Sequence, residues 1–366
     1  MLSVRNSHYQ MKEVRGENPC CGIGGIDMEL MHGVNLGGWM SQCVYEEDHY
    51  DTFISKQDIA QIAKSGFDHV RLPVDYPVLE EEDGTYRKSG FDRLYKVIDW
   101  CMEYKLNIIL DLHRTYGYDF NDAGDKEKNS LFNNQDAKDR FVNLWIEIAK
   151  HFFGYNNIAF ELLNDVVEED CIDEWNALIH RTVGEIRKIA PLTPIIYGGV
   201  QWNSARTMQY LGAPIDENII YTFHFYEPLI FTHQKAYWVK NMDPEADVHY
   251  PAKKADYIEQ CIALGDQGIP LVQNPREKVD IDWLEEVMSD AITTADRYGV
   301  QLYCGEYGVI DRAPLEDTLN WFRDTTSLFR KYKIGSAVWS WKEMDFGLTE
   351  PHYDDLRDEI IREITR

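Results

Sequence analysis

The sequence lacks long apolar runs, paired cysteines and an excess of positive charge. Its seven cysteines are scattered apart from the adjacent Cys20 and Cys21, and none has the spacing of a metal site. An odd, scattered set is typical of reduced thiols. No run of about eighteen apolar residues occurs, so no segment is expected to span a membrane. Met1 to Gly16 lack the apolar centre of a signal peptide. We therefore expect a cytoplasmic protein, or a secreted one if a signal peptide has been removed.

Positive charge is scarce: 37 Lys and Arg residues stand against 63 Asp and Glu, a net charge of -26. Such a surface repels phosphate backbones and anionic lipids, so we expect no nucleic-acid or membrane partner. Solubility alone also explains most of this charge. Apolar residues make up 44% of the chain and aromatics 13%, which argues against disorder. We expect a folded monomer.

Short apolar, β-branched runs alternate with amphipathic stretches along the whole chain. Eight runs are candidate strands: Leu30–Leu36, Phe67–Pro73, Ile108–His113, Ile158–Asn164, Pro194–Tyr197, Ile219–Tyr226, Leu302–Glu306 and Ser336–Trp341. The clearest helical patterns are Ile54–Lys64, Phe91–Tyr104, Ala137–Phe153, Ile172–Ile189, Trp283–Tyr298 and Leu315–Tyr332. Strand–helix alternation requires a parallel sheet, and eight repeats favour a closed (β/α)8 TIM barrel.

An open nucleotide-binding sheet is the alternative to a barrel. It needs a glycine-rich phosphate turn after its first strand, and Gly33, Gly37 and Gly38 do not form one. We therefore expect one catalytic barrel over 1–366. The connection after the sixth strand, 227–282, is long and aromatic, and it predicts a small insertion subdomain on the rim over the cleft. Residues 1–28 form an N-terminal extension with no clear pattern and no assigned function.

Polar and aromatic groups gather where the predicted strands end, which is where barrel enzymes carry their active residues. Glu306 follows the seventh strand and Asp165 the fourth. Two facing carboxylates are what glycoside hydrolysis requires: one attacks the anomeric carbon, and the other protonates the departing oxygen and later activates water. We predict Glu306 as nucleophile and Asp165 as acid/base.

Further strand-end residues fit around this pair. Arg71 and Tyr226 are expected to donate hydrogen bonds to Glu306, and Asn164 to the 2-hydroxyl of the sugar. His113 and His224 are expected to bind sugar hydroxyls and to hold neighbouring carboxylates, while Trp339 forms a stacking floor. Each also has a structural interpretation, in which a strand-end His or Arg or a buried Trp serves only to pack the barrel.

Other acidic residues near the site receive structural interpretations. Asp111 is expected to tie down a barrel loop. Glu161 is expected to point along the lower part of the barrel, away from the site. Glu168 and Glu169 are expected to be loop charges. None of the three glutamates is predicted to replace Asp165 as acid.

The strand-end strings resemble glycoside hydrolase family five, a family of retaining (β/α)8 glycosidases, across almost the whole chain. The resemblance runs from GVNLGGW (33–39) to WSWKEMDF (339–346). GFDHVRLP (66–73) and FHFYEP and FTHQKA within 223–236 are similar to the bacterial endoglucanase C branch. It implies Glu306 as nucleophile, with Arg71, His113, Asn164, His224, Tyr226 and Trp339 at the other site positions. It also implies internal cleavage of a β-1,4 or mixed-linked β-1,3-1,4-glucan, or of its oligosaccharides, with no cofactor.

The acid/base position departs from the family pattern, which has Asn-Glu where this chain has Asn164-Asp165. The shorter side chain leaves a gap of roughly 1.3 Å to a proton acceptor that a Glu would reach. An introduced Glu→Asp substitution that slows turnover is one explanation, and a natural variant with an adjusted backbone is another. An inverting mechanism is the third, because a shortened arm widens the pair.

Two functions of other kinds stay open at this stage. A glycan-binding protein on a catalytically impaired scaffold would explain Asp165, although Glu306 is retained. A metal-dependent hydrolase would use His113, His224, Asp165 and Glu306 as ligands, but no His-x-His or His-Glu-x-x-His motif occurs, so we expect no metal. Glucan linkage and endo or exo action are not determined by the sequence.

Overall fold

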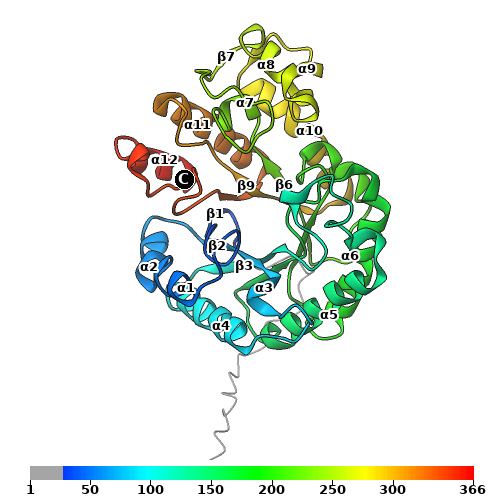
Figure 1. Ribbon diagram of the computed structural model, residues 1–366. Helices are drawn as coiled ribbons and strands as arrows, with labels where there is room; N and C mark the ends of the chain where they lie inside the picture. The colour runs from blue at the N-terminus through cyan, green and yellow to red at the C-terminus, as the bar shows by residue number, and fades with distance from the viewer. Residues whose placement is uncertain (1–27) are drawn as a thin grey trace, which may run out of the picture.

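Eight parallel strands close into a barrel in the computed structural model, which describes residues 28–366 (Figure 1). The order around the barrel is β1-β10-β9-β6-β5-β4-β3-β2. The predicted (β/α)8 fold is confirmed, and the eight predicted strands are the barrel strands. Their bounds are β1 His32–Asn35, β2 His69–Asp75, β3 Asn107–Arg114, β4 Ile158–Glu161, β5 Ile195–Gly198, β6 Ile219–Phe225, β9 Gln301–Tyr307 and β10 Gly335–Val338.

Two strands end three residues earlier than the sequence predicts. β4 stops at Glu161 rather than Asn164, and β10 stops at Val338 rather than Trp341. In both cases the residues past the strand leave the regular sheet and turn over the rim. The predicted site residues Asn164, Asp165 and Trp339 therefore lie on loops that the barrel holds in place.

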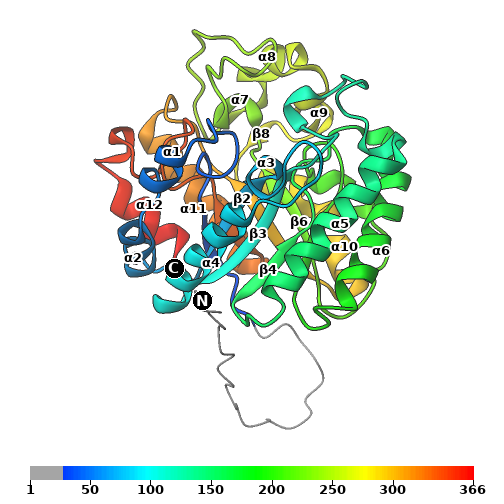
Figure 2. The ribbon, with the colours of Figure 1, turned by 60° about the horizontal axis from the view of Figure 1, so that its bottom comes forward.

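Amphipathic helices surround the barrel, as Figures 1 and 2 show. Each packs one apolar side on the strands, for example Phe141, Leu144, Trp145 and Ile148 of α5. The six predicted helices are present as α2 Lys56–Lys64, α4 Lys88–Glu103, α5 Gln135–Phe152, α6 Ile172–Arg187, α10 Ile281–Tyr298 and α11 Leu315–Tyr332. Shorter helices are α1 Glu47–Thr52, α3 Tyr76–Leu79 and α12 Arg357–Ile364. The connection from β5 to β6 carries the 3-10 helix η4, Ala205–Tyr210.

The barrel interior is layered. Seven buried residues form an apolar cluster of their own: Leu30, Ile109, Ala159, Ile196, Ile220, Tyr303 and Ala337. Side chains two positions apart on a strand share a face, so Asp111, Glu161 and Thr222 lie one layer further along β3, β4 and β6. All three are completely buried. The interior thus changes from apolar to polar toward the C-terminal ends of the strands, where the predicted site lies.

The segment 227–282 contains its own small elements. They are α7 Leu229–Thr232, β7 Ala252–Lys253, α8 Ile258–Ala263, α9 Ile269–Gln273 and β8 Lys278–Val279. β7 pairs with β8 in an antiparallel sheet separate from the barrel. Figure 1 shows α7, β7, α8 and α9 together at the top of the view. Within the described residues, none of the helices combines the length and apolar character that a bilayer crossing needs. The extension predicted over 1–28 falls, up to residue 27, outside the described residues.

Candidate active site

Arg71 on β2 lies at the centre of the polar layer and is completely buried. Its Nη1 donates to Glu306 Oε1 at 2.8 Å and to Asn35 Oδ1 at 3.0 Å. Its Nη2 donates to Asn164 Oδ1 at 2.8 Å. Its Nε and Nη2 also donate to the two oxygens of Glu161, at 2.7 and 3.1 Å. The predicted contact between Arg71 and Glu306 is therefore present, within a larger network that fixes several strand ends at once.

Glu306 on β9 faces His224 on β6, because an irregularity in the strand pairing aligns the two residues. A Cβ atom at Gly305 would lie 3.1 Å from His224 Nε2, so glycine leaves room for this close approach. The hydroxyl of Tyr226 donates to Glu306 Oε2 at 3.1 Å. Burial would raise the pKa of Glu306, but the positive charges of His224 and Arg71 lower it below its ordinary value. The geometry thus favours an ionised carboxylate, as a nucleophile requires.

Asp165 lies on the loop after β4 and also approaches His224. The histidine Nδ1 is 2.9 Å from Asp165 Oδ1 and 3.7 Å from Glu306 Oε2. Asp165 Oδ1 and Glu306 Oε2 can therefore be no further apart than the sum of these two distances. This upper limit is close to the lower edge of the roughly 6.5–9.5 Å range of inverting pairs. Burial would lower the pKa of His224, but the negative charges of Glu306 and Asp165 raise it. The structure brings the predicted pair together around one imidazole.

Trp339 lies on the loop directly after β10 and is held flat. Its ring stacks on His113, with centroids 5.8 Å apart and planes at 7°. A Cβ atom at Gly37 would come within 2.7 Å of the indole, so the first strand's loop passes close beneath it. The orientation of the indole plane is therefore fixed by neighbours on two sides.

Asp111 was predicted to tie down a barrel loop, and this prediction is wrong. It is completely buried in the barrel interior, with Oδ2 2.7 Å from His113 Nδ1 and 3.1 Å from Arg71 Nη2. Burial would lower the pKa of His113, but the charges of Asp111 and Glu306 raise it. Asp111 therefore orients His113 from below, because period-two alternation turns its side chain inward.

The side-chain amide of Asn164 uses its oxygen, but not its nitrogen, in a hydrogen bond among residues 28–366. Its Oδ1 accepts from Arg71, while its buried Nδ2 has no hydrogen-bond partner among residues 28–366. A buried donor without a partner is costly unless a ligand completes it. This amide is available to donate to a bound molecule.

The other acidic residues near Asp165 have separate roles. The side chain of Glu161 is in the layer below, as expected, but it is directed at Arg71, and its complete burial excludes it as a proton donor to substrate. Glu168 accepts from the hydroxyl of Tyr118 at 2.8 Å. Glu169 accepts from Gln201 Nε2 at 2.6 Å. Both behave as loop-fixing charges.

Arg114, directly after His113, is held by three partners that the sequence analysis did not identify. Its Nε is 3.1 Å from Asp75 Oδ2, Nη1 donates to Asp119, and Nη2 donates to the hydroxyl of Tyr45. Asp75 ends β2 and Tyr45 follows β1, so the pairing of β1, β2 and β3 brings them to Arg114. These contacts make Arg114 a brace between rim loops.

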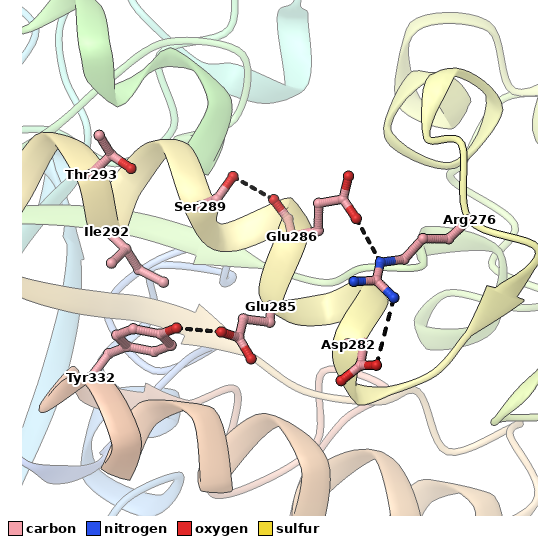
Figure 3. A pocket seen from close by; sticks show the side chains of 8 residues that line it. All are labelled: Arg276, Asp282, Glu285, Glu286, Ser289, Ile292, Thr293 and Tyr332. Atoms are coloured by element: carbon pink, nitrogen blue, oxygen red, sulfur yellow. Dashed lines mark hydrogen bonds and ion pairs between the residues drawn. The ribbon is translucent and has the colours of Figure 1, made fainter.

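One cavity lies away from this cluster of residues. It measures about 470 Å³ and opens between α10 and α11 on the outside of the barrel (Figure 3). Its charged groups are already paired: Arg276 donates to Glu286 at 2.6 Å, and Glu285 accepts from Tyr332. The strand-end carboxylates, with their convergent partners, are the better candidate site. Residues 28–366 contain no group of three or more His, Cys, Asp or Glu arranged to hold a metal ion.

A closed (β/α)8 barrel with two carboxylates at its C-terminal rim defines the class of the barrel glycoside hydrolases. The family model described as cellulase (glycosyl hydrolase family 5) matches residues 31–345. The chain belongs to this family, as the sequence motifs implied.

Two relatives match most of the chain. Cellodextrinase A of Ruminococcus flavefaciens is 41% identical over 306 residues, which cover 83% of each chain. Endoglucanase C of Acetivibrio thermocellus is 38% identical over 339 residues, which cover 91% of this chain and 97% of the relative.

Solved structures support the fold alone. The cellulose synthase subunit Z of Clostridioides difficile superposes with a TM-score of 0.73 at 22% identity, covering 92% of this chain and 100% of that one. Cel5A of Thermotoga maritima, solved in complex with mannotriose, gives a TM-score of 0.71 at 22% identity, with 91% and 97% covered.

Proposed function

We propose that this protein is a retaining endo-β-glucanase that cleaves β-1,4-glucan or mixed-linked β-1,3-1,4-glucan, or the corresponding oligosaccharides, by double displacement. The observation that carries the proposal is the placement of Glu306 and Asp165 on two sides of His224 Nδ1, at 3.7 and 2.9 Å. The names of the two relatives, a cellodextrinase and an endoglucanase, support this substrate class.

In the first step Glu306 attacks the anomeric carbon and the glycosidic bond breaks. The departing oxygen takes the proton of Asp165, which thereby becomes a carboxylate. The sugar stays bound to Glu306 as an ester. Arg71 and Tyr226 donate to different oxygens of Glu306, so they hold the attacking carboxylate in one orientation. Such preorganisation lowers the cost of reaching the transition state.

In the second step Asp165 takes a proton from water, and the resulting hydroxide equivalent attacks the anomeric carbon. The ester bond to Glu306 breaks, the sugar leaves with its original configuration, and both carboxyl groups return to their starting states. His224 contacts both carboxylates and so couples their charges through the cycle.

The remaining site residues support sugar binding. In this proposal the Nδ2 of Asn164, which has no hydrogen-bond partner among residues 28–366, donates to the 2-hydroxyl of the sugar undergoing cleavage. The fixed indole of Trp339 supplies an apolar plane for the sugar ring, and the neighbouring His113 supplies a polar edge. No cofactor takes part in these steps.

Asp165 limits the rate in this proposal. Its carboxylate lies 2.9 Å from His224 Nδ1. General acid–base help contributes about 10²–10⁴-fold, and a donor one methylene too short forfeits part of it.

The segment 227–282 is proposed to form one wall of the cleft. Trp238 is 44% exposed, and its ring lies 6.3 Å from that of His233, which packs edge-on against Tyr226 at 4.8 Å. The segment is thereby joined to a residue that contacts Glu306, and it presents an exposed indole beside it.

The test compares this chain with its Asp165→Glu variant on barley mixed-linked glucan, carboxymethyl-cellulose and an activated aryl β-cellobioside. Sugar release from both glucans is expected to rise about 10²-fold or more in the variant. Release of the aryl group is expected to change far less, because a good leaving group needs little protonation.

Two outcomes would contradict the proposal. If folded protein of both forms cleaves neither glucan nor the aryl glycoside, the chain binds glycans on an impaired scaffold. If Glu at 165 raises all three rates equally, the residue acts on a step other than proton donation.

A further inference from the structure

Arg71 divides its charge unequally among three carboxylates. Asp111 Oδ2 lies 3.1 Å from its Nη2. Glu161 receives two hydrogen bonds, from Nε at 2.7 Å and from Nη2 at 3.1 Å. Glu306 receives one, from Nη1 at 2.8 Å. Paired, parallel hydrogen bonds from a guanidinium are stronger than a single one. The residue that never reaches substrate therefore has the larger share of this cation.

Burial raises the pKa of Glu161 above its ordinary value, while its two hydrogen bonds from Arg71 oppose that rise and favour the carboxylate. Both of its oxygens accept from Arg71, and neither makes another hydrogen bond within residues 28–366. A protonated carboxyl group would need an acceptor for its own hydrogen, and a completely buried one without an acceptor is costly. The bidentate contact with a guanidinium, by contrast, is the geometry of a carboxylate.

We propose that Glu161 is a positioning residue that competes with Glu306 for the charge of Arg71 and thereby keeps the nucleophile more basic than Arg71 alone would allow. The inference rests on the proposed role of Glu306 as nucleophile. It assigns a function to a buried charge on β4 that mere packing would not require, since apolar residues fill the layer below at Ile109, Ala159 and Ile220.

The groups around both carboxylates set the direction of the effect. Charged or titratable neighbours of Glu306 are Arg71, His113, Asp165, His224, Tyr226, His233 and Cys304. Those of Glu161 are Arg71, Asp111, His224 and Tyr303. Arg71 and His224 belong to both sets. Neutralising Glu161 removes a negative charge from the shared cations, which then stabilise the carboxylate form of Glu306 more strongly.

The experiment measures the reactivity of Glu306 in a step that does not require proton donation by Asp165. Inactivation by 2,4-dinitrophenyl 2-deoxy-2-fluoro-β-cellobioside transfers the fluorosugar to the nucleophile and releases dinitrophenolate, which needs no proton. The rate is measured from pH 3 to 8 for the native chain, Glu161→Gln and Glu161→Asp. The acid-side midpoint is the pH at which the inactivation rate is half of its plateau value. In Glu161→Gln this midpoint is expected to lie about one pH unit lower than in the native chain, and the plateau rate is expected to be smaller. Glu161→Asp keeps the charge and is expected to keep the native acid-side midpoint.

An unchanged midpoint in folded Glu161→Gln overturns the inference, because a merely structural role would lower the rate without moving the midpoint. If the native chain takes no fluorosugar on Glu306, the proposed function itself fails, which is a different result.

If Glu161→Gln does not fold, the native protein still decides. In an atomic-resolution crystal structure the two C–O bonds of Glu161 are expected to be equal, as in a carboxylate. One long and one short bond would mean a neutral acid that cannot compete for Arg71, and would overturn the inference.

Discussion

Glu306 and Asp165 face the same histidine, but they are held in different ways. Glu306 lies on a barrel strand and receives hydrogen bonds from Arg71 on β2 and from Tyr226, which directly follows β6. Asp165 lies on a loop past the end of β4 and approaches only His224 among the site residues described above. The nucleophile is fixed by the closed barrel, whereas the acid depends on the path of one loop.

From this difference we expect the two positions to tolerate change unequally. Shortening Glu306 by a methylene would break contacts with two donors and leave Arg71 partly unpaired in the interior. Shortening the acid disturbs one contact at the edge of the network. A Glu-to-Asp difference from the family pattern is thus compatible with an intact fold at position 165. The same difference at position 306 would disturb the buried network.

The largest effect is expected from removing the nucleophile. Glu306→Gln should reduce hydrolysis of both glucan and an activated aryl cellobioside by roughly 10⁴-fold or more, because no other group can form the ester. Asp165→Asn is the matched variant on the other side. It should lose glucan hydrolysis but retain most of the aryl release of the first turnover, because only the second step then needs Asp165. If both variants lose the same activity on both substrates, Glu306 and Asp165 do not have the different roles of nucleophile and acid.

Removing Arg71 should break the network around the nucleophile. Arg71→Met leaves Glu161, Glu306 and Asp111 without their shared cation, and the free energy of unfolding should fall by about 3–5 kcal/mol in urea titrations. Arg181 is the control, since it pairs with Asp139 at the surface with both side chains more than 40% exposed. Arg181→Met should cost less than about 1 kcal/mol. Similar costs for both would show that the buried network adds nothing special.

A smaller effect is expected at Tyr226. Tyr226→Phe removes one hydrogen bond to ionised Glu306, which is worth about 1.5–3 kcal/mol, so kcat/KM for cello-oligosaccharides should fall roughly 10- to 100-fold. Tyr237→Phe, at a ring that is 84% exposed, provides the control and should leave kcat/KM unchanged. A wild-type rate in Tyr226→Phe would mean that Arg71 alone orients the nucleophile.

The smallest effect concerns pH and His224. Its pKa is raised in the folded state, so its stabilising contribution is complete below the ordinary value of about 6.5 and is lost as pH rises through the folded-state pKa. The free energy of unfolding of the native chain should therefore fall more steeply above pH 6.5 than that of His224→Gln. The two slopes should differ by at most about 1.4 kcal/mol per pH unit. Parallel curves would mean that His224 does not gain charge between the carboxylates.

Most of the fold was readable from the sequence because parallel strands are buried on both sides and appear as continuous apolar runs. The candidate site residues Arg71, His113, His224 and Glu306 were predicted for the same reason, since each interrupts or closes such a run. Strand ends were less accurate: β4 and β10 stop before the predicted residues, because apolar side chains such as Leu162 and Leu163 stay buried after the strand has ended.

The roles of Glu161 and Asp111 could not be read from the sequence in the same way. Asp111 lies within β3 and Glu161 is the last residue of β4, and what each contacts depends on the stagger between neighbouring strands. A usable signal was present, however. In the strand pairing Arg71 is opposite Ile109, and Asp111 is opposite Glu161, so the two acids are neighbours on adjacent strands. Two buried acids in register require a shared cation, and Arg71 is the one that β2 supplies.

The stereochemistry of hydrolysis tests the central claim most directly. Proton NMR spectra recorded within minutes of adding enzyme to a cello-oligosaccharide or mixed-linked oligosaccharide distinguish the anomers of the new reducing end. The account predicts that the β-anomer appears first and then mutarotates, because Glu306 forms an ester that water displaces in a second inversion. First appearance of the α-anomer would contradict it and would mean that Asp165 and Glu306 act on a single direct displacement by water.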